Sequence, residues 1–208
     1  MKPEELTTEM ESCRRLFVQD RTDEALRLSG EILAEADAIL RNKKDAASST
    51  LFTEAASLHA DMLRAEGMNA DAFSVALLSM TQAELLGKES EEISIQELSL
   101  VSCAFTSFDS LINTSGERFL TDAEAVREIA SALFTILYIL YRRCNTASTG
   151  SSSGCRRGIL ETAYGILSEY NGRIPLLASY AENPGDVSLS DIYALITGKA
   201  LSIGILSL

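Results

Sequence analysis

The chain has 208 residues, of which 46% are hydrophobic and 23% charged, and its formal net charge at pH 7 is −12. A chain of this length buries roughly 70% of its unfolded surface, so it needs no metal or disulfide to form a core, and its composition argues against disorder, collagen and a membrane bundle. Because thirty acidic residues outnumber eighteen basic ones, binding to nucleic acid is disfavoured.

The N-terminus does not resemble an export segment, and no apolar run reaches the length of a membrane span. Residues Met1 to Glu5 are polar and acidic, unlike a secretory signal. The longest apolar run, Ile129 to Tyr141, is shorter than the roughly 20 residues of a membrane span. The four cysteines show no CxxC pair. We therefore expect a cytoplasmic protein with reduced thiols and no membrane association.

Apolar residues recur at helical spacing through the first half of the chain, and caps and stops divide it into four helices. The predicted start signals are the capping box of Thr8 and Glu11, then Thr22 or Asp23, and later Asn69. The predicted stop signals are Gly67 and Gly87. The segment 41–45 is a weak break, since it lacks Gly and Pro. The predicted buried residues are Leu16, Phe17, Ala25, Leu28, Ile32, Ala36, Ile39, Phe52, Ala55, His59, Met62, Leu63, Phe73, Ala76, Met80 and Ala83.

The second half continues the helical pattern, and no segment alternates as a strand would. A capping box of Ser94 and Glu97 begins the fifth helix, whose apolar face is Leu98, Val101, Phe105, Phe108 and Ile112. A long apolar helix follows, with Ile129 and Leu133 on its buried face. Residues 145–154 are predicted to form a flexible Ser/Gly loop, and further helices are expected over 155–171 and 188–206.

The predicted helices pair as antiparallel hairpins within one all-α domain spanning 1–208. The hairpins cover approximately 8–41, 45–87, 94–144 and 155–206. One spacing occurs twice: Cys13, Leu16 and Ala25 are separated by three and nine positions, as are Ala60, Leu63 and Ala72. Small residues at such positions let paired helices approach closely.

Two segments, Leu16 to Leu26 and Glu66 to Phe73, resemble the turn of a tetratricopeptide repeat. By that resemblance, which covers residues 8–87, small positions of the first helices are occupied by Cys13 and Ala60, and those of the second helices by Ala25 and Ala72. The chain departs from the family in three ways. Ala25 and Ala72 are 47 positions apart instead of about 34, Ser29 and Ala76 replace a usual large aromatic, and no proline closes either hairpin.

The resemblance implies hairpins stacked as a short right-handed α-solenoid, whose concave face of first helices binds a protein or peptide. Those first helices are expected near 8–19, 45–66, 94–113 and 155–171. Residues 1–100 hold ten Lys and Arg against twenty Asp and Glu, which favours a basic partner segment. The alternatives are an irregular all-α bundle that binds a small apolar ligand, or an oligomeric structural protein, both supported by the apolar run Ile129 to Tyr141.

No enzymatic activity, cofactor or metal is predicted, because the sequence has no P-loop, GxSxG or HExxH motif. The one histidine, His59, lies on an apolar helix face and is interpreted as a packing residue. Cys13 and Cys103 lie in apolar helices and are interpreted as small buried hydrophobic residues.

The only dense basic cluster brackets the Ser/Gly loop, and its members are Arg142, Arg143, Arg156 and Arg157. It suits an anion or an acidic partner, or ordinary pairing with acidic residues of the N-terminal half. The adjacent Cys144 and Cys155 are a candidate redox pair.

The C-terminal helix is unusually apolar for the end of a solenoid. Its apolar residues are Ala194, Leu195, Ile196, Leu201, Ile203, Ile205 and Leu206. We expect this helix either to dock on the core of a monomer or to form a homodimer interface.

Overall fold

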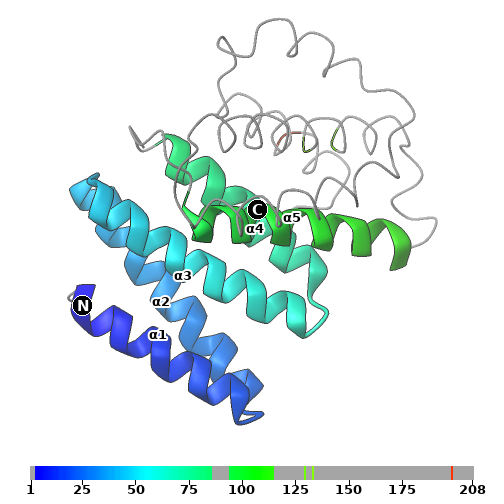
Figure 1. Ribbon diagram of the computed structural model, residues 1–208, viewed down its shortest axis with the longest axis horizontal. Helices are drawn as coiled ribbons and strands as arrows, with labels where there is room; N and C mark the ends of the chain where they lie inside the picture. Colours follow the sequence, from blue (N-terminus) through cyan, green and yellow to red (C-terminus); the bar gives the residue numbers. More distant parts are fainter. Residues whose placement is uncertain (1–2, 86–93, 115–128, 130–132, 134–197, 199–208) are drawn as a thin grey trace, which may run out of the picture.

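The computed structural model describes residues 3–85 and 94–114, together with Ile129, Leu133 and Gly198. The two ranges form five helices and contain no strand (Figure 1). The helices are α1 (Pro3–Val18), α2 (Thr22–Lys43), α3 (Ala46–Ala65), α4 (Asn69–Leu85) and α5 (Ile95–Thr114). Ile129 and Leu133 are also helical and buried, as their spacing predicts. The predicted all-α class is therefore confirmed for the part of the chain that is described.

The predicted caps of the first two helices are wrong. Helix α1 begins at Pro3, whose fixed φ and missing N–H suit a first turn. Thr8 lies inside that helix, where its hydroxyl donates to the Glu4 carbonyl at 3.1 Å. Helix α2 has Arg21 at its N-cap and no side-chain cap hydrogen bond, so neither Thr22 nor Asp23 caps it.

The charged segment between α2 and α3 ends one helix and starts the next without glycine or proline. Lys44 takes the left-handed conformation, with φ 51°, and its N–H donates to the Leu40 carbonyl at 2.9 Å. The Asp45 carboxylate then accepts from the Ser48 N–H at 2.7 Å, and the Ser48 hydroxyl accepts from the Asp45 N–H at 3.2 Å. This reciprocal capping box stabilises the first turn of α3.

The capping box predicted for α5 is confirmed. The Glu97 carboxylate accepts from the Ser94 N–H at 2.6 Å, and the Ser94 hydroxyl accepts from the Glu97 N–H at 3.2 Å. Two backbone donors at the start of α5 are thereby satisfied.

Replacing Ser94 with alanine is expected to lower the free energy of unfolding by about 1 kcal/mol, because the first turn of α5 loses its hydroxyl acceptor. Urea denaturation followed by circular dichroism measures the loss. Ser74→Ala is the matched control, since the Ser74 hydroxyl donates to the Ala70 carbonyl within α4 and caps nothing. An equal loss in both variants would contradict the capping role.

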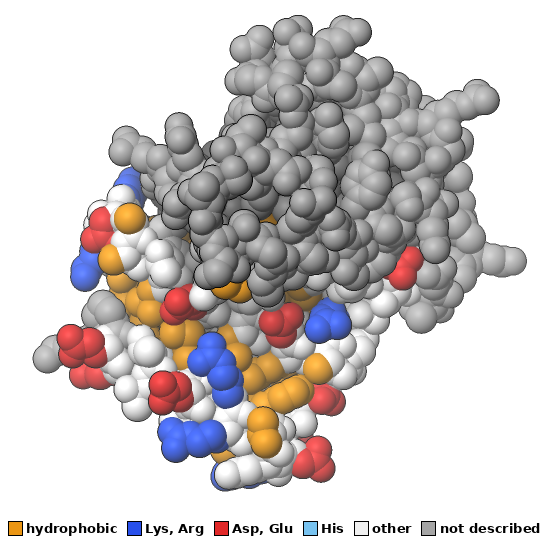
Figure 2. Space-filling view, in the orientation of Figure 1, with side chains coloured by type: hydrophobic (Ala, Val, Ile, Leu, Met, Phe, Trp, Pro, Cys, Tyr) orange, Lys and Arg blue, Asp and Glu red, His pale blue; other side chains and the backbone are white. Residues whose placement is uncertain are grey.

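Each described helix packs against the next along the chain, and α3 also packs along α5, whereas α1 touches α3 only slightly. Cross-helix contacts show that α3 and α5 run in parallel. Gln96 Nε2 lies 3.4 Å from Glu54 Oε1, and further along both helices Cys103 Sγ lies 3.6 Å from the Ala60 carbonyl oxygen. Helix α3 is therefore enclosed on most of its sides. On the face formed by α1 to α3, apolar side chains gather in a strip with charged side chains on both sides (Figure 2).

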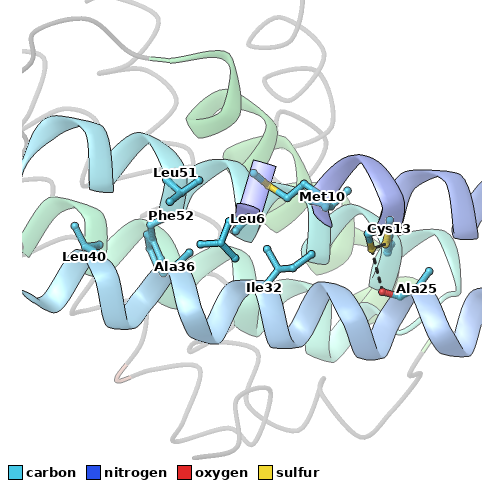
Figure 3. Close-up of a cluster of buried hydrophobic side chains, with 12 residues drawn as sticks. Leu6, Met10, Cys13, Ala25, Ile32, Ala36, Leu40, Leu51 and Phe52 are labelled. Carbon is cyan, nitrogen blue, oxygen red and sulfur yellow. Dashed lines mark hydrogen bonds between the residues drawn. The ribbon is translucent and has the colours of Figure 1, made fainter. Parts of the chain in front are cut away.

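The core of the first three helices is a cluster of interlocking apolar side chains. Figure 3 shows Leu6 and Met10 of α1 close to Ile32 and Ala36 of α2 and to Leu51 and Phe52 of α3. At one end of this cluster Cys13 Sγ lies 3.1 Å from the Ala25 carbonyl oxygen (Figure 3). Such a short approach requires a small residue on each helix, and both residues are fully buried.

The second small pair is buried in the same way, since Ala60 on α3 and Ala72 on α4 are both 0% exposed. The small residues at both occurrences of the shared spacing are therefore buried. In the described ranges no helix has both the length and the apolar character to span a membrane.

Candidate interaction face

One stripe of α3 remains at the surface because the other sides of the helix contact its neighbours. The stripe consists of Ala47, Thr50, Glu54, Asp61 and Arg64, and is called the α3 stripe below. Its members are three, four or seven positions apart, so they share one face of the helix. Ala47, Thr50 and Arg64 are exposed, whereas Glu54 and Asp61 are half-buried. The stripe therefore presents two partly buried carboxylates.

Helix α5 holds both carboxylates through neutral polar side chains. The Gln96 amide donates to Glu54, and the Ser99 hydroxyl donates to Asp61 Oδ2 at 3.2 Å. Arg64 Nη2 lies 3.9 Å from Asp61 Oδ1, a long ion pair in which both side chains are nearly half exposed. Such a pair contributes little to stability. Burial raises the pKa of Asp61, and the Arg64 charge and the Ser99 hydrogen bond oppose that rise.

The described part of the chain carries a large excess of negative charge. The described ranges 3–85 and 94–114 contain eight Lys and Arg against eighteen Asp and Glu. Four of the eight bases form ion pairs with nearby acids: Arg21 with Glu24, Arg27 with Glu31, Arg41 with Asp37, and Arg64 with Asp61. The excess of carboxylates generates a field that attracts cationic groups.

His59 lies away from the α3 stripe, in the contact between α2, α3 and α4. Its Nδ1 lies 2.7 Å from the Oγ of the fully buried Ser29 on α2. Burial lowers the pKa of the imidazole, and the carboxylate of Asp71 on α4 opposes that effect. This geometry agrees with the interpretation of His59 as a helix-packing residue. Among the described residues, no three His, Cys, Asp or Glu side chains lie where they could hold a metal ion.

The two described cysteines are buried free thiols, as their apolar helices predict. Burial raises the pKa of Cys13, and it raises that of Cys103 to about 11 despite a hydrogen bond with Ser107. Because the thiolate is the reactive form, both side chains are held in their unreactive state at neutral pH.

The other sequence-predicted site residues lie outside the described residues. They are Arg142, Arg143, Arg156, Arg157, Cys144 and Cys155. The predicted loop 145–154 lies there as well, and so does the C-terminal helix except for Gly198, which is helical and exposed.

The pairing of Glu54 with Gln96 and of Asp61 with Ser99 was not predicted. Helical periodicity alone places Glu54 and Asp61 on the polar side of α3, which is the signal that points to them. The partners on α5 follow from the packing register of two helices that are distant in sequence.

Compared with known proteins, the chain matches no family model, no curated protein and no solved structure. The class that the described residues define is therefore structural: an all-α protein of consecutively packed helices.

Proposed function

We propose that the protein is a non-enzymatic interaction module that binds a protein segment bearing Lys or Arg along its first helices, α1, α3 and α5. The observation that carries the proposal is the α3 stripe, where α5 holds Glu54 and Asp61 through Gln96 and Ser99. Carboxylates that are already oriented lose little conformational entropy when a cation binds. The excess negative charge of the described ranges favours rapid encounter with a basic segment.

The spacing of the two carboxylates suits a defined partner geometry. Glu54 and Asp61 are seven residues apart on one helix, which corresponds to about 10 Å along its axis. Two basic residues seven positions apart on a partner helix have the same separation, as do residues three apart in an extended peptide. The Gln96 and Ser99 side chains add neutral hydrogen-bonding groups beside each carboxylate.

The proposed architecture is a short right-handed α-solenoid of the tetratricopeptide type. The buried small residues Cys13, Ala25, Ala60 and Ala72 support it, as does the parallel packing of α3 and α5. In such an arrangement successive first helices line one face, which is where a partner binds. We propose a cytoplasmic location because both described cysteines are free thiols.

The test is a binding assay on an array of synthetic 15-residue peptides that vary in Lys and Arg spacing, followed by titration of the best binder. We expect saturable binding that weakens as salt rises. The double variant Glu54→Gln with Asp61→Asn is expected to weaken binding by about 2- to 30-fold, since each surface ion pair contributes roughly 0.2–1 kcal/mol.

The matched control is Glu31→Gln with Glu35→Gln, which removes the same charge from an exposed stripe of α2. It is expected to leave the dissociation constant nearly unchanged at physiological salt. Equal weakening in both double variants would show that only net charge matters. No saturable binding to any basic peptide would overturn the proposed function.

A further inference from the structure

His59 lies where the first pair of helices meets the second. The ring belongs to α3, and its Nδ1 contacts Ser29 on α2 at 2.7 Å. The adjacent Gly30 faces the same ring, since a Cβ at that position would lie 3.6 Å from His59 Cε1. Asp71 at the start of α4 acts on the same ring through its charge. The His59 ring on α3 therefore interacts with residues of both α2 and α4.

The contacts of Ser29 favour one neutral tautomer of this ring. Ser29 Oγ lies 2.9 Å from the Leu26 carbonyl oxygen, which can only accept a hydrogen bond. When the single hydroxyl hydrogen is used toward Leu26, Ser29 Oγ accepts a hydrogen bond from His59 Nδ1. The neutral ring then carries its hydrogen on Nδ1 and a lone pair on Nε2, the atom that takes up a proton in acid.

We propose that His59 is an acid-sensitive joint, in which the neutral ring holds α2 against α3 and a proton on Nε2 loosens that packing. A proton there places a positive charge in a half-buried position that faces Gly30 of α2. On the α2 side the ring meets Ser29 and Gly30, neither of which is charged. In the described ranges the charged group that acts on the ring is Asp71 of α4, and it only partly compensates the cost of burial.

The direction in which pH changes the stability follows from the direction of the pKa shift of His59. Burial lowers the pKa of His59 in the folded protein, whereas an unfolded histidine titrates near pH 6.5. As pH falls the unfolded chain therefore binds the proton first. The stability that the neutral ring contributes is fully present above about pH 6.5. It is lost as pH falls toward the pKa of His59 in the folded protein, and below that pKa the ring causes no further loss.

The first experiment is an NMR titration of the ring, which is free of overlap because the chain has one histidine. Long-range ¹H–¹⁵N spectra at pH 7.5 are expected to show the Nδ1–H tautomer, and the ring pKa is expected below 6.5. An Nε2–H tautomer, or a pKa at or above 6.5, would overturn the proposal.

The second experiment compares wild type with His59→Asn, whose amide can still hydrogen-bond Ser29 but does not titrate. The wild-type folding constant, measured by urea denaturation, is expected to fall between pH 7 and pH 5 by about tenfold for every unit that separates the unfolded from the folded pKa. Hydrogen exchange, corrected for intrinsic rates, is expected to show faster exchange of α2 and α3 amides at pH 5. The variant is expected to lack both changes beyond the background titration of carboxylates.

A second variant keeps the test decisive if His59→Asn does not fold. Asp71 is exposed, so Asp71→Asn is expected to fold and to move both the ring pKa and the loosening of α2 and α3 to lower pH. Loosening at an unchanged pH, or loosening that persists in a folded His59→Asn, would assign the effect to other groups.

Discussion

Replacing Phe73 with alanine is expected to lower the free energy of unfolding by about 3–5 kcal/mol, a large part of the 5–15 kcal/mol typical of a folded protein. The Phe73 side chain on α4 is fully buried, and its ring centroid lies 5.8 Å from that of Phe108 on α5, with the planes tilted by 31°. Truncation removes both the buried apolar surface and the ring pair, and leaves a cavity that enclosed helices cannot close. Urea denaturation monitored by circular dichroism measures the loss.

Leu78→Ala is the matched control on the same helix. Leu78 is 40% exposed, so its truncation is expected to cost about 0.5–1 kcal/mol. The double variant Phe73→Ala with Phe108→Ala tests the contact itself, since paired rings contribute about 0.5–1.5 kcal/mol beyond their buried area. If Phe73→Ala lowered the free energy of unfolding no more than Leu78→Ala, the described packing of α4 on α5 would be contradicted.

Several features of the fold that the sequence predicted correctly are local. The capping box of Ser94 and Glu97 depends on residues three positions apart, and Asn69 begins α4 as its position after Gly67 suggested. Gly67 itself has a φ of 75°, a conformation that glycine adopts without steric cost. Short-range hydrogen bonding and backbone sterics decide such features, so they can be predicted without knowing the tertiary structure.

The missed features show where local rules compete. Thr8 can cap a helix, but the chain before it is also helical, so its hydroxyl bonds to a carbonyl inside the helix instead. Asp45 was not predicted as a cap because its partner at the third helical position is Ser48, and the usual pattern has Glu or Gln there. Thr8 and Glu11 thus have the form of a capping box without acting as one, whereas Asp45 and Ser48 form a box without the usual Glu or Gln.

The burial of α3 could not be predicted from its polarity. Thr53 is fully buried, yet its hydroxyl contacts the Ser49 and Thr50 carbonyls of its own helix at 3.1 and 2.9 Å. A hydroxyl satisfied within its own helix can be enclosed at little cost, and hydropathy does not reveal it. The register that brings Glu54 to Gln96 is likewise set by how side chains of α3 and α5 interlock, and a linear pattern does not encode it.

Ala25→Leu is the second variant for which we expect a large effect, a loss of about 3 kcal/mol or failure to fold. Ala25 is fully buried, and its carbonyl oxygen lies 3.1 Å from Cys13 Sγ, which leaves no volume for three further carbons between α1 and α2. Relief requires the two helices to separate, which also disturbs the contact of Cys13 Sγ with Met62 Sδ at 3.7 Å. Thermal and urea denaturation measure the loss.

Ala38→Leu separates crowding from any general effect of leucine. Ala38 is exposed on the same helix, so this variant is expected to remain within about 0.5 kcal/mol of wild type. Adding Cys13→Ala to Ala25→Leu should restore part of the lost stability, because it removes the Sγ atom that contacts Ala25 and frees volume between the two helices. If Ala25→Leu were as harmless as Ala38→Leu, α1 and α2 would not pack through these small residues. The proposed row of first helices would then lose its first member, and with it the structural basis for binding along α1, α3 and α5.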